Sequence, residues 1–218
     1  MESVNKVYCV HLINKNELKI TGNGNSQVWK KAVPLTDFIS PWDLNYVSKT
    51  EFRALWDGDY FFFCFAVFDS SIHINRIDDS VEGIANSDRV ELFFKPDATL
   101  NPYYCLEIDS DARILDFIAY PKRRFDYNWK WPKDCIQVKS SVNENGFIVE
   151  GAITIASLNQ LNLIQENCIQ TGVYRAKYNS VDRINFEPTW LSWVDPKTEM
   201  PDFHIASSFG MFQLVDLD

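Results

Sequence analysis

The run from residue 60 to residue 68 most constrains the fold. It reads Tyr-Phe-Phe-Phe-Cys-Phe-Ala-Val-Phe and is apolar on both faces of an extended chain, so a strand here needs cover on both sides. Residues 49–56 alternate between apolar and polar side chains, and Asp57-Gly58-Asp59 separates the two runs as a turn. The pair predicts a hairpin at the centre of a β-sandwich, with loops folded over one of its sheets.

Short strand-like runs continue along the chain, with one short helical stretch at residues 156–163. Glu144-Asn145-Gly146 predicts a hairpin turn in which Asn145 and Gly146 take positive φ. The pattern predicts an all-β fold, an antiparallel β-sandwich of jelly-roll type with one short helix, as a single domain over residues 1–218. The further predicted strands are residues 7–13, 29–33, 88–94, 103–109, 113–119, 136–142, 147–155, 173–179 and 211–215, and the longest predicted loops are residues 35–46, 69–87, 121–132 and 190–210.

The charge and the aromatic content of the chain narrow its choice of partner. A formal net charge of −9 produces a field that repels phosphate backbones and anionic lipid. We therefore expect neither nucleic acid nor a membrane as partner, although Lys122-Arg123-Arg124 lies among aromatic residues that suit single strands. Seven Trp, nine Tyr and sixteen Phe exceed what the packing of one domain needs, which predicts that some rings act at a surface.

The five cysteines contain no Cys-x-x-Cys pair and no His at zinc-finger spacing, so they are interpreted as free thiols and not as a metal site. The first residues lack the basic flank and apolar core of a signal peptide, and no run reaches the ~20 apolar residues of a membrane span. As written, the chain is expected in the cytoplasm, or outside the cell or in the periplasm if a signal has been removed. Its oligomeric state is left open.

Aromatic residues gather in a predicted loop at residues 121–132. Trp129 and Trp131 are two residues apart, so in an extended loop they lie on the same side of the chain, and charged residues flank them. A core Trp rarely has basic neighbours on both sides, so this pattern predicts that both rings are exposed and available to a ligand.

A second aromatic stretch lies near the C-terminus, at residues 190–210. Trp193 has apolar neighbours, so core packing and ligand contact are equally supported for it. Two interpretations are open for Phe203 and His204. Either Phe203 packs inside the loop and His204 makes a structural hydrogen bond beside it, or both residues contact a ligand. This stretch is interpreted as the aromatic rim of a binding site.

Three carboxylates are the candidate polar contacts. Glu91 lies on one predicted strand, and Glu107 and Asp109 share its parity on the next. Arg175, on a later strand, is predicted to point toward them as a ligand donor or a salt-bridge partner. Exposed side chains of a sheet face without any function are the alternative.

Acidic residues also fill the predicted loop at residues 69–87. Asp69, Asp78 and Asp79 supply the hard oxygen ligands that calcium prefers, so they are the candidate metal ligands. No EF-hand spacing accompanies them, and solvated loop acids are the alternative. Calcium is the one cofactor that the residues leave open.

Six short segments follow one another in order over about residues 50–215. They are Leu55-Trp56-Asp57, Val67-Phe68-Asp69, Ser87-Asp88-Arg89-Val90-Glu91-Leu92-Phe93, Gly146-Phe147-Ile148-Val149-Glu150-Gly151-Ala152-Ile153, Trp193-Val194-Asp195-Pro196 and Phe203-His204-Ile205-Ala206-Ser207-Ser208-Phe209-Gly210. This order resembles that of the family 9 carbohydrate-binding modules and related family 9-like proteins. The resemblance implies a β-sandwich that binds glucans, xylans or short oligosaccharides, often at a reducing end, with structural calcium.

The resemblance carries over to individual residues only in part. Family modules hold a sugar between two Trp rings, and the corresponding places here hold Ala85 and Phe203. Glu91 matches the family's sugar-contacting acid, and Trp193 matches the Trp of its Trp-x-Asp-Pro segment. With Ala85 in place of a ring, Trp129 or Trp131 is expected to supply the missing wall.

The leading hypothesis is non-catalytic carbohydrate binding, in which rings pack on the C–H face of a sugar and carboxylates bond its hydroxyls. The first alternative is a glycoside-active enzyme that uses Glu91 with Glu107 or Asp109, since glycosidases need two carboxylates across a cleft. The second is a protein-interaction sandwich that has lost sugar binding. No nucleophile or acid motif accompanies the carboxylates, and a β-sandwich does not itself imply catalysis, so no enzyme activity is predicted.

Overall fold

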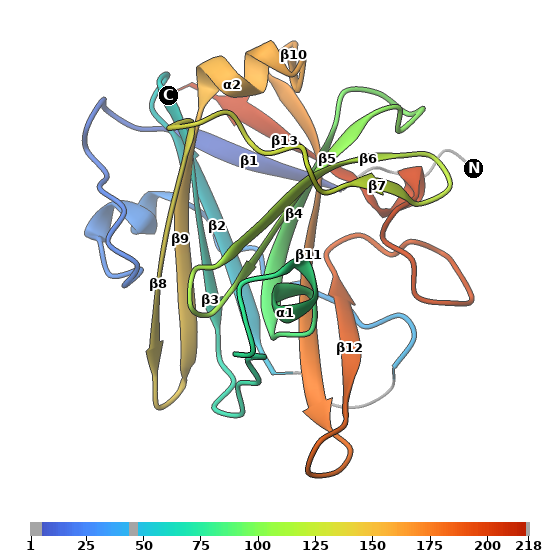
Figure 1. Ribbon diagram of the computed structural model, residues 1–218. Helices are drawn as coiled ribbons and strands as arrows, with labels where there is room; N and C mark the ends of the chain where they lie inside the picture. The colour runs from blue at the N-terminus through green and yellow to red at the C-terminus, as the bar shows by residue number, and fades with distance from the viewer. Residues whose placement is uncertain (1–5, 44–47, 217–218) are drawn as a thin grey trace.

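The computed structural model describes residues 6–43 and 48–216, where thirteen strands form one curled sheet (Figure 1). Its hydrogen-bonded order is β7-β6-β5-β4-β11-β13-β1-β2-β3-β9-β8, with β10 and β12 each pairing with β11. The strands are β1 (Val7–Leu12), β2 (Thr50–Trp56), β3 (Tyr60–Val67), β4 (Arg89–Lys95), β5 (Tyr103–Asp109), β6 (Ile114–Tyr120), β7 (Arg124–Asp126), β8 (Ile136–Asn143), β9 (Gly146–Thr154), β10 (Ile164–Gln165), β11 (Cys168–Ser180), β12 (Phe186–Ser192) and β13 (Gly210–Val215).

The predicted central hairpin is confirmed. Strands β2 and β3 pair antiparallel from Thr50↔Val67 to Trp56↔Phe61. In the turn between them, Gly58 has φ +88°, a conformation that favours glycine. Oδ1 of Asp57 accepts hydrogen bonds from the backbone N–H groups of Asp59 and Tyr60 at 3.0 and 2.8 Å, so the turn is closed by a side chain.

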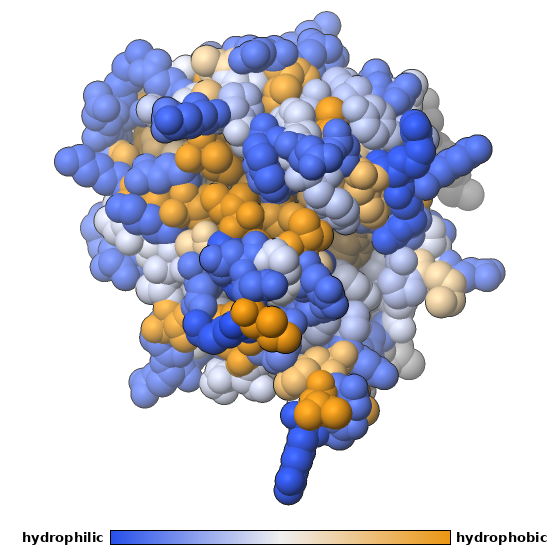
Figure 2. Space-filling view, viewed as in Figure 1, coloured by the Kyte–Doolittle hydropathy of each residue, from blue (hydrophilic) through white to orange (hydrophobic). Residues whose placement is uncertain are grey.

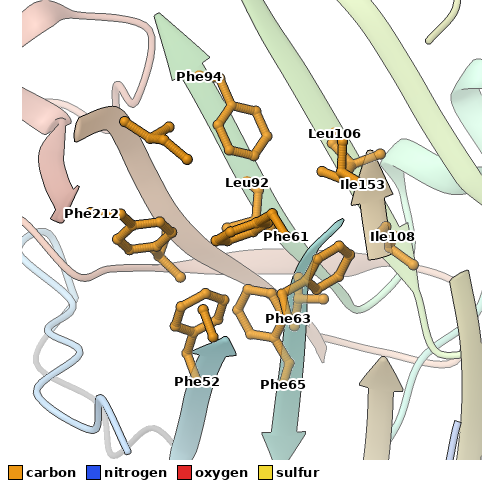
Figure 3. Packing of buried hydrophobic residues seen from close by; sticks show 14 of the residues in the cluster. Phe52, Phe61, Phe63, Phe65, Leu92, Phe94, Leu106, Ile108, Ile153 and Phe212 are labelled. Atoms are coloured by element: carbon orange, nitrogen blue, oxygen red, sulfur yellow. The ribbon is translucent and has the colours of Figure 1, made fainter. Parts of the chain in front are cut away.

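The main core lies between the two halves of the curled sheet, as expected of a sandwich. Rings of Phe52, Phe61 and Phe212 from three strands stack there, with Phe212 5.4 Å from Phe52 and 5.8 Å from Phe61 between centroids. Figure 3 shows them beside Leu92 of β4 and Leu106 of β5. Each such buried side chain contributes about 1.5–3 kcal/mol relative to an exposed one, so this cluster holds the two layers together.

The second face of β3 is covered by residues 13–33, which confirms the prediction that loops fold over one sheet. Phe62 and Cys64 are buried under this segment together with Trp29. Glu150 of β9 is fully buried, and it accepts hydrogen bonds from the indole Nε1–H of Trp29 and the backbone N–H of Gly22, both at 2.6 Å. These donors offset the cost of burying the carboxylate and fix the segment to the sheet.

The outer face of β4, β5 and β11 carries the site. Val90, Leu92 and Phe94 of β4 point into the main core, while Arg89, Glu91 and Phe93 point to the other face. Helix α1 (Val81–Ala85) lies in front of β4 and β11 (Figure 1). The side chain of Ser80 caps this helix by accepting from the N–H of Gly83. The helix lies inside residues 69–87, which were predicted to be irregular.

Several predicted elements differ from the observed ones. Residues 27–31 form a 3₁₀ helix, not a strand, because Ser26 caps it and the Trp29 side chain turns inward to Glu150. Strand β1 pairs parallel with β13 and with β2, so the sandwich is not wholly antiparallel. The predicted single helix is one of two short α-helices in the described ranges, namely α2 (Ile155–Gln160) beside α1. No helix of those ranges is long and apolar enough to span a membrane.

The β8–β9 hairpin forms as predicted, but its turn is one residue earlier. Asn143 and Gly146 are paired, so Glu144 and Asn145 are the two turn residues. Gly146 alone of the predicted pair has positive φ, at +148°, and a Cβ there would lie 1.9 Å from the carbonyl oxygen of Val67. Close approach of the backbone therefore explains the glycine.

Candidate functional site

A pocket of about 200 Å³ opens on the outer face of β4 and β5, beneath α1 and the loop before β13. It combines charged residues at its floor with aromatic rings at its sides. Hydrophobic side chains are exposed across the middle of the face shown in Figure 2, with hydrophilic ones around them. The pocket is lined by Trp42, Ala85, Arg89, Glu91, Glu107, Leu115, Phe117, Arg123, Phe125, Tyr127, Trp190, Pro201, Asp202, Phe203 and His204.

The floor of the pocket holds one cation between two carboxylates. Glu91 and Glu107 are paired across the β4–β5 ladder, so they leave the sheet on the same side. Nε of Arg89 lies 2.9 Å from Oε1 of Glu91 and 2.7 Å from Oε2 of Glu107. These three buried atoms make no well-aligned hydrogen bond to any described residue. The floor is therefore an ion-pair cluster with unused hydrogen-bonding capacity.

The ionisable groups at the floor change one another's pKa values. Burial, and after it the charge of Glu107, raises the pKa of Glu91 to about 8, although Arg89 acts in the opposite direction. Burial also raises the pKa of Glu107. Burial disfavours the Arg89 cation, but the charges of Glu107 and Glu91 outweigh it and raise its pKa. Burial and mutual repulsion therefore both favour protonation of one of these two carboxyl groups.

One side of the pocket is a group of three rings, those of Phe203, Trp42 and Trp190. Trp42 lies 5.5 Å and Trp190 5.8 Å from the Phe203 ring between centroids, and the Trp190 ring is perpendicular to it. Both indoles are half-buried, so part of each ring is open to a ligand. The Nε1–H of Trp42 donates to the carbonyl of Thr198 at 2.9 Å, and the guanidinium of Arg89 lies 5.4 Å over Trp190.

A second group of rings contains His204 and the residues around β7. The Phe125 ring lies 4.7 Å from His204 and 6.0 Å from Tyr127, whose side chain is 38% exposed. Nδ1 of His204 and the hydroxyl of Tyr103 are hydrogen-bonded at 2.9 Å. Burial, and after it the charges of Arg123 and Arg89, lowers the pKa of His204 to about 3, so this ring is neutral at neutral pH.

Four of the residues proposed from the sequence come together in this pocket, namely Glu91, Glu107, Phe203 and His204. Ala85 lines it too, so the two positions that the resemblance assigns to the family's Trp clamp both face one cavity. Trp42, Arg89 and the residues around β7 also line the pocket but were not predicted as site residues. Arg89 could have been predicted from the sequence, because it lies two residues before Glu91 and therefore on the same face of the strand. Trp42 could not, because it lies in a long loop without a periodic pattern.

Trp129 and Trp131 do not supply the wall missing at Ala85. The prediction that Trp131 is exposed is wrong, because its ring is 4% exposed and its Nε1–H donates to the hydroxyl of Ser157 at 3.1 Å. Trp129 is half-buried and packs 5.2 Å from Tyr104 and 5.8 Å from Trp131. Both rings lie over the core and outside the pocket.

Three further proposed residues have structural partners. Asp109 is fully buried, binds Nε of Arg113 at 2.6 Å and accepts two backbone N–H groups in the β5–β6 turn. Arg175 does not point toward the acids, because it pairs with Val90 in the ladder and lies on the opposite face from Glu91. It binds Asp69 at 2.6 Å, which confirms the salt-bridge alternative. Trp193 is 2% exposed and packs against Phe212, so the core alternative is confirmed.

The candidate calcium ligands do not fit a shared cation site. Oδ2 of Asp69 already faces two cations, Arg175 at 2.6 Å and Lys177 at 3.3 Å. Asp78 accepts the N–H of Ser80, and Asp79 lies 3.4 Å from Arg113. Within residues 6–43 and 48–216, no three His, Cys, Asp or Glu side chains gather so as to hold a metal ion. Calcium binding stays a prediction without support from these residues.

Residues 20–217 match the model of the Carbohydrate family 9 binding domain-like family. The chain belongs to this family. Its fold is that of a carbohydrate-binding module, as the resemblance predicted. No curated protein sequence matches this family 9-like chain.

Solved structures with the same fold share little sequence with this family 9-like chain. A Bacteroides uniformis protein, provisionally assigned as carbohydrate-binding, is 17% identical with a TM-score of 0.73, covering 97% of this chain and 100% of its own. A family 9 module from Caldicellulosiruptor kristjanssonii is 13% identical with a TM-score of 0.66, in complexes with glucose and with cellotriose. These cover 98% of this chain, and 97% and 95% of their own. At this identity the likeness concerns the fold.

Proposed function

We propose that the chain is a non-catalytic carbohydrate-binding protein and that the pocket on β4 and β5 takes one sugar ring. The observation that carries the proposal is the meeting of Glu91 and Glu107 with the rings of Trp190 and Phe203 in one cavity. Aromatic rings pack on the C–H face of a pyranose, and carboxylates and guanidinium groups bond its hydroxyls. Membership of the family supports this reading.

The size of the pocket supports a small ligand or the end of a longer one. Its volume is about 200 Å³, below the roughly 300–1,000 Å³ of sites that enclose drug-sized ligands. A single ring enters it, and further residues of an oligosaccharide extend past the exposed Tyr127 and Arg123 at the opening.

Calorimetric titration tests the proposal. Glucose and cellotriose, the ligands of the Caldicellulosiruptor module, are the first probes, followed by a panel of xylan, mannan and host-type oligosaccharides. We expect saturable heat with at least one of them, and weaker binding for Glu91→Gln because a ligand contact changes. Absence of heat with every sugar contradicts the proposal and leaves the protein-interaction alternative.

A glycoside hydrolase is the second candidate, because such enzymes use two carboxyl groups, one with a raised pKa, and here burial raises the pKa of both Glu91 and Glu107. The arrangement fits poorly, since both groups contact the same nitrogen of Arg89 at the floor of the pocket and do not face each other across an open cleft. An assay for newly formed reducing ends decides between the two. Release of sugar by the wild-type protein that Glu91→Gln abolishes favours the enzyme.

A further inference from the structure

The residues that line the pocket include more negative than positive side chains. The charged ones are two cations, Arg89 and Arg123, and three carboxylates, Glu91, Glu107 and Asp202. Arg123 and Asp202 form a pair of their own, 2.9 Å apart, with the Arg123 side chain 52% exposed. The buried floor is therefore left with two carboxylates for one guanidinium, and an uncompensated buried charge is costly.

Arg89 cannot satisfy both carboxylates. Its Nη1–H donates away from them, to the carbonyls of Ala85 and Ser87. Nε, the Arg89 atom in both ion pairs with Glu91 and Glu107, carries a single proton and so cannot donate a full hydrogen bond to each of them. The three facing atoms are all buried and have no well-aligned hydrogen bond within the described residues. The floor therefore has an excess of acceptors and of negative charge.

Among the residues that the structure describes, no other titratable group packed around the floor supplies the missing positive charge. Burial raises the pKa of Cys105, Tyr127, Tyr174 and Tyr178, which keeps all four neutral at neutral pH, and the pKa of His204 is lowered to about 3. Without a ligand, a proton on one of the carboxyl groups offsets the excess negative charge, because burial and the charge of Glu107 raise the pKa of Glu91 to about 8. A ligand that brings its own positive charge can displace that proton.

We propose that this pocket selects sugars that carry a primary amine, such as 2-amino-2-deoxyglucose, over the same sugars without one. The inference rests on the proposed function and names its ligand class. An ammonium group on the ring offers charge-assisted hydrogen bonds to Glu91 and Glu107, and the half-buried rings of Trp42 and Trp190 beside the floor favour a cation. A uronic acid adds a third carboxylate to the floor and is rejected.

The proposal includes a proton balance. The ligand enters with its ammonium group charged, the protonated carboxyl group of the floor loses its proton, and that proton passes to the buffer. A neutral sugar leaves the carboxyl group protonated. Binding of the amino sugar therefore releases up to one proton per site, and binding of glucose releases none.

Calorimetry with four matched ligands tests this inference. Glucosamine, glucose, N-acetylglucosamine and glucuronate are titrated at about pH 6.5, below the roughly 7.7–8 at which α-amino groups lose their proton. We expect glucosamine to bind about tenfold more tightly than glucose, which is the effect of one charge-assisted hydrogen bond. Its heat should differ between phosphate and Tris buffers, because these take up the released proton with different enthalpies. Glucuronate should not bind.

A variant of the floor makes the test specific. In Glu107→Gln, which keeps the shape and removes one charge, the ratio of the glucosamine and glucose affinities should fall toward one and proton release should disappear. Glu144→Gln removes an exposed carboxylate in the β8–β9 turn and should keep both, and thermal melting checks that each variant is folded. Equal affinity of the wild-type protein for glucose and glucosamine overturns this inference alone. Failure of all four sugars and of the wider panel overturns the proposed function with it.

Discussion

Tyr174 and Phe203 lie face to face, with ring centroids 4.2 Å apart and ring planes 14° from parallel. Tyr174 is fully buried on β11, and its hydroxyl binds the backbone carbonyl and the hydroxyl of Ser208 at 3.1 and 2.8 Å. A Cβ on Gly172 would lie 1.9 Å from that hydroxyl, so the glycine leaves room for the ring. Tyr174 thus fixes the loop before β13 at two points and sets the position of Phe203 in the pocket.

Replacement of Phe203 by alanine is expected to cost stability and affinity together. The ring is 6% exposed and packs on Tyr174, Trp190 and Trp42, and Phe→Ala in such sites costs about 3–5 kcal/mol of the free energy of unfolding. Urea denaturation measures this loss, and titration of the folded variant measures sugar binding. Phe68→Ala, at a ring that is 46% exposed, should stay within about 0.5 kcal/mol. Unchanged stability of Phe203→Ala would contradict the packing described.

Two tryptophans of similar burial should behave differently. Trp190→Ala removes a ring of the pocket and is expected to weaken sugar binding about tenfold or more, as loss of an aromatic anchor does. Trp129→Ala removes a ring that packs on Tyr104 and Trp131 outside the pocket, so it should lower stability and leave affinity unchanged. Parallel titrations check the pair. Equal loss of affinity in both variants would place the sugar over Trp129 instead.

Loss of Arg175 should affect stability and not binding. Its guanidinium is fully buried and binds Asp69 at 2.6 Å and the hydroxyl of Ser48 at 2.7 Å. Arg175→Ala leaves that carboxylate without its closest cation, and breaking a buried pair costs about 3–5 kcal/mol. Arg76→Ala, in the exposed pair with Asp111, should cost about 0–1 kcal/mol. Chemical denaturation measures both variants, and a weaker sugar affinity in folded Arg175→Ala would refute its structural role.

Stability should fall as the pH rises from 6.5 to 8. The pKa of Glu91 is about 8 in the folded protein and 4.5 in the unfolded chain, so within this interval the folded state binds more protons and loses stability on deprotonation. His204, with a folded pKa of about 3 and an unfolded value of 6.5, acts only below this interval. Denaturation curves across the range should show a shallower slope for Glu91→Gln. An identical slope would mean that the floor holds no extra proton.

The strands of the sheet were largely predictable. Apolar and polar side chains alternate along a half-buried strand, and the buried strand β3 is apolar on both faces. The same period of two correctly placed Glu91 and Glu107 on one side of adjacent strands. The same period placed Arg175 on the wrong face of the sheet. Alternation along one strand shows which residues share a face, but only the pairing register shows which of these faces also carries Glu91 of the neighbouring strand. Trp131 was misjudged because a charged neighbour does not fix the direction of the next side chain: Lys130 is 54% exposed, while the Trp131 ring turns inward to Ser157.

The all-β class, the central hairpin and the membership of a carbohydrate-binding family follow from the amino-acid sequence alone, because they depend on local periodicity and on the order of short segments. Which rings face the carboxylates depends instead on how distant segments pack. Trp42, Trp190 and Phe203 are far apart in the chain, and they meet because Tyr174 binds the last loop and the curled sheet brings β12 to it. Long-range packing of this kind leaves no periodic signal, so the walls of the pocket are a property of the fold.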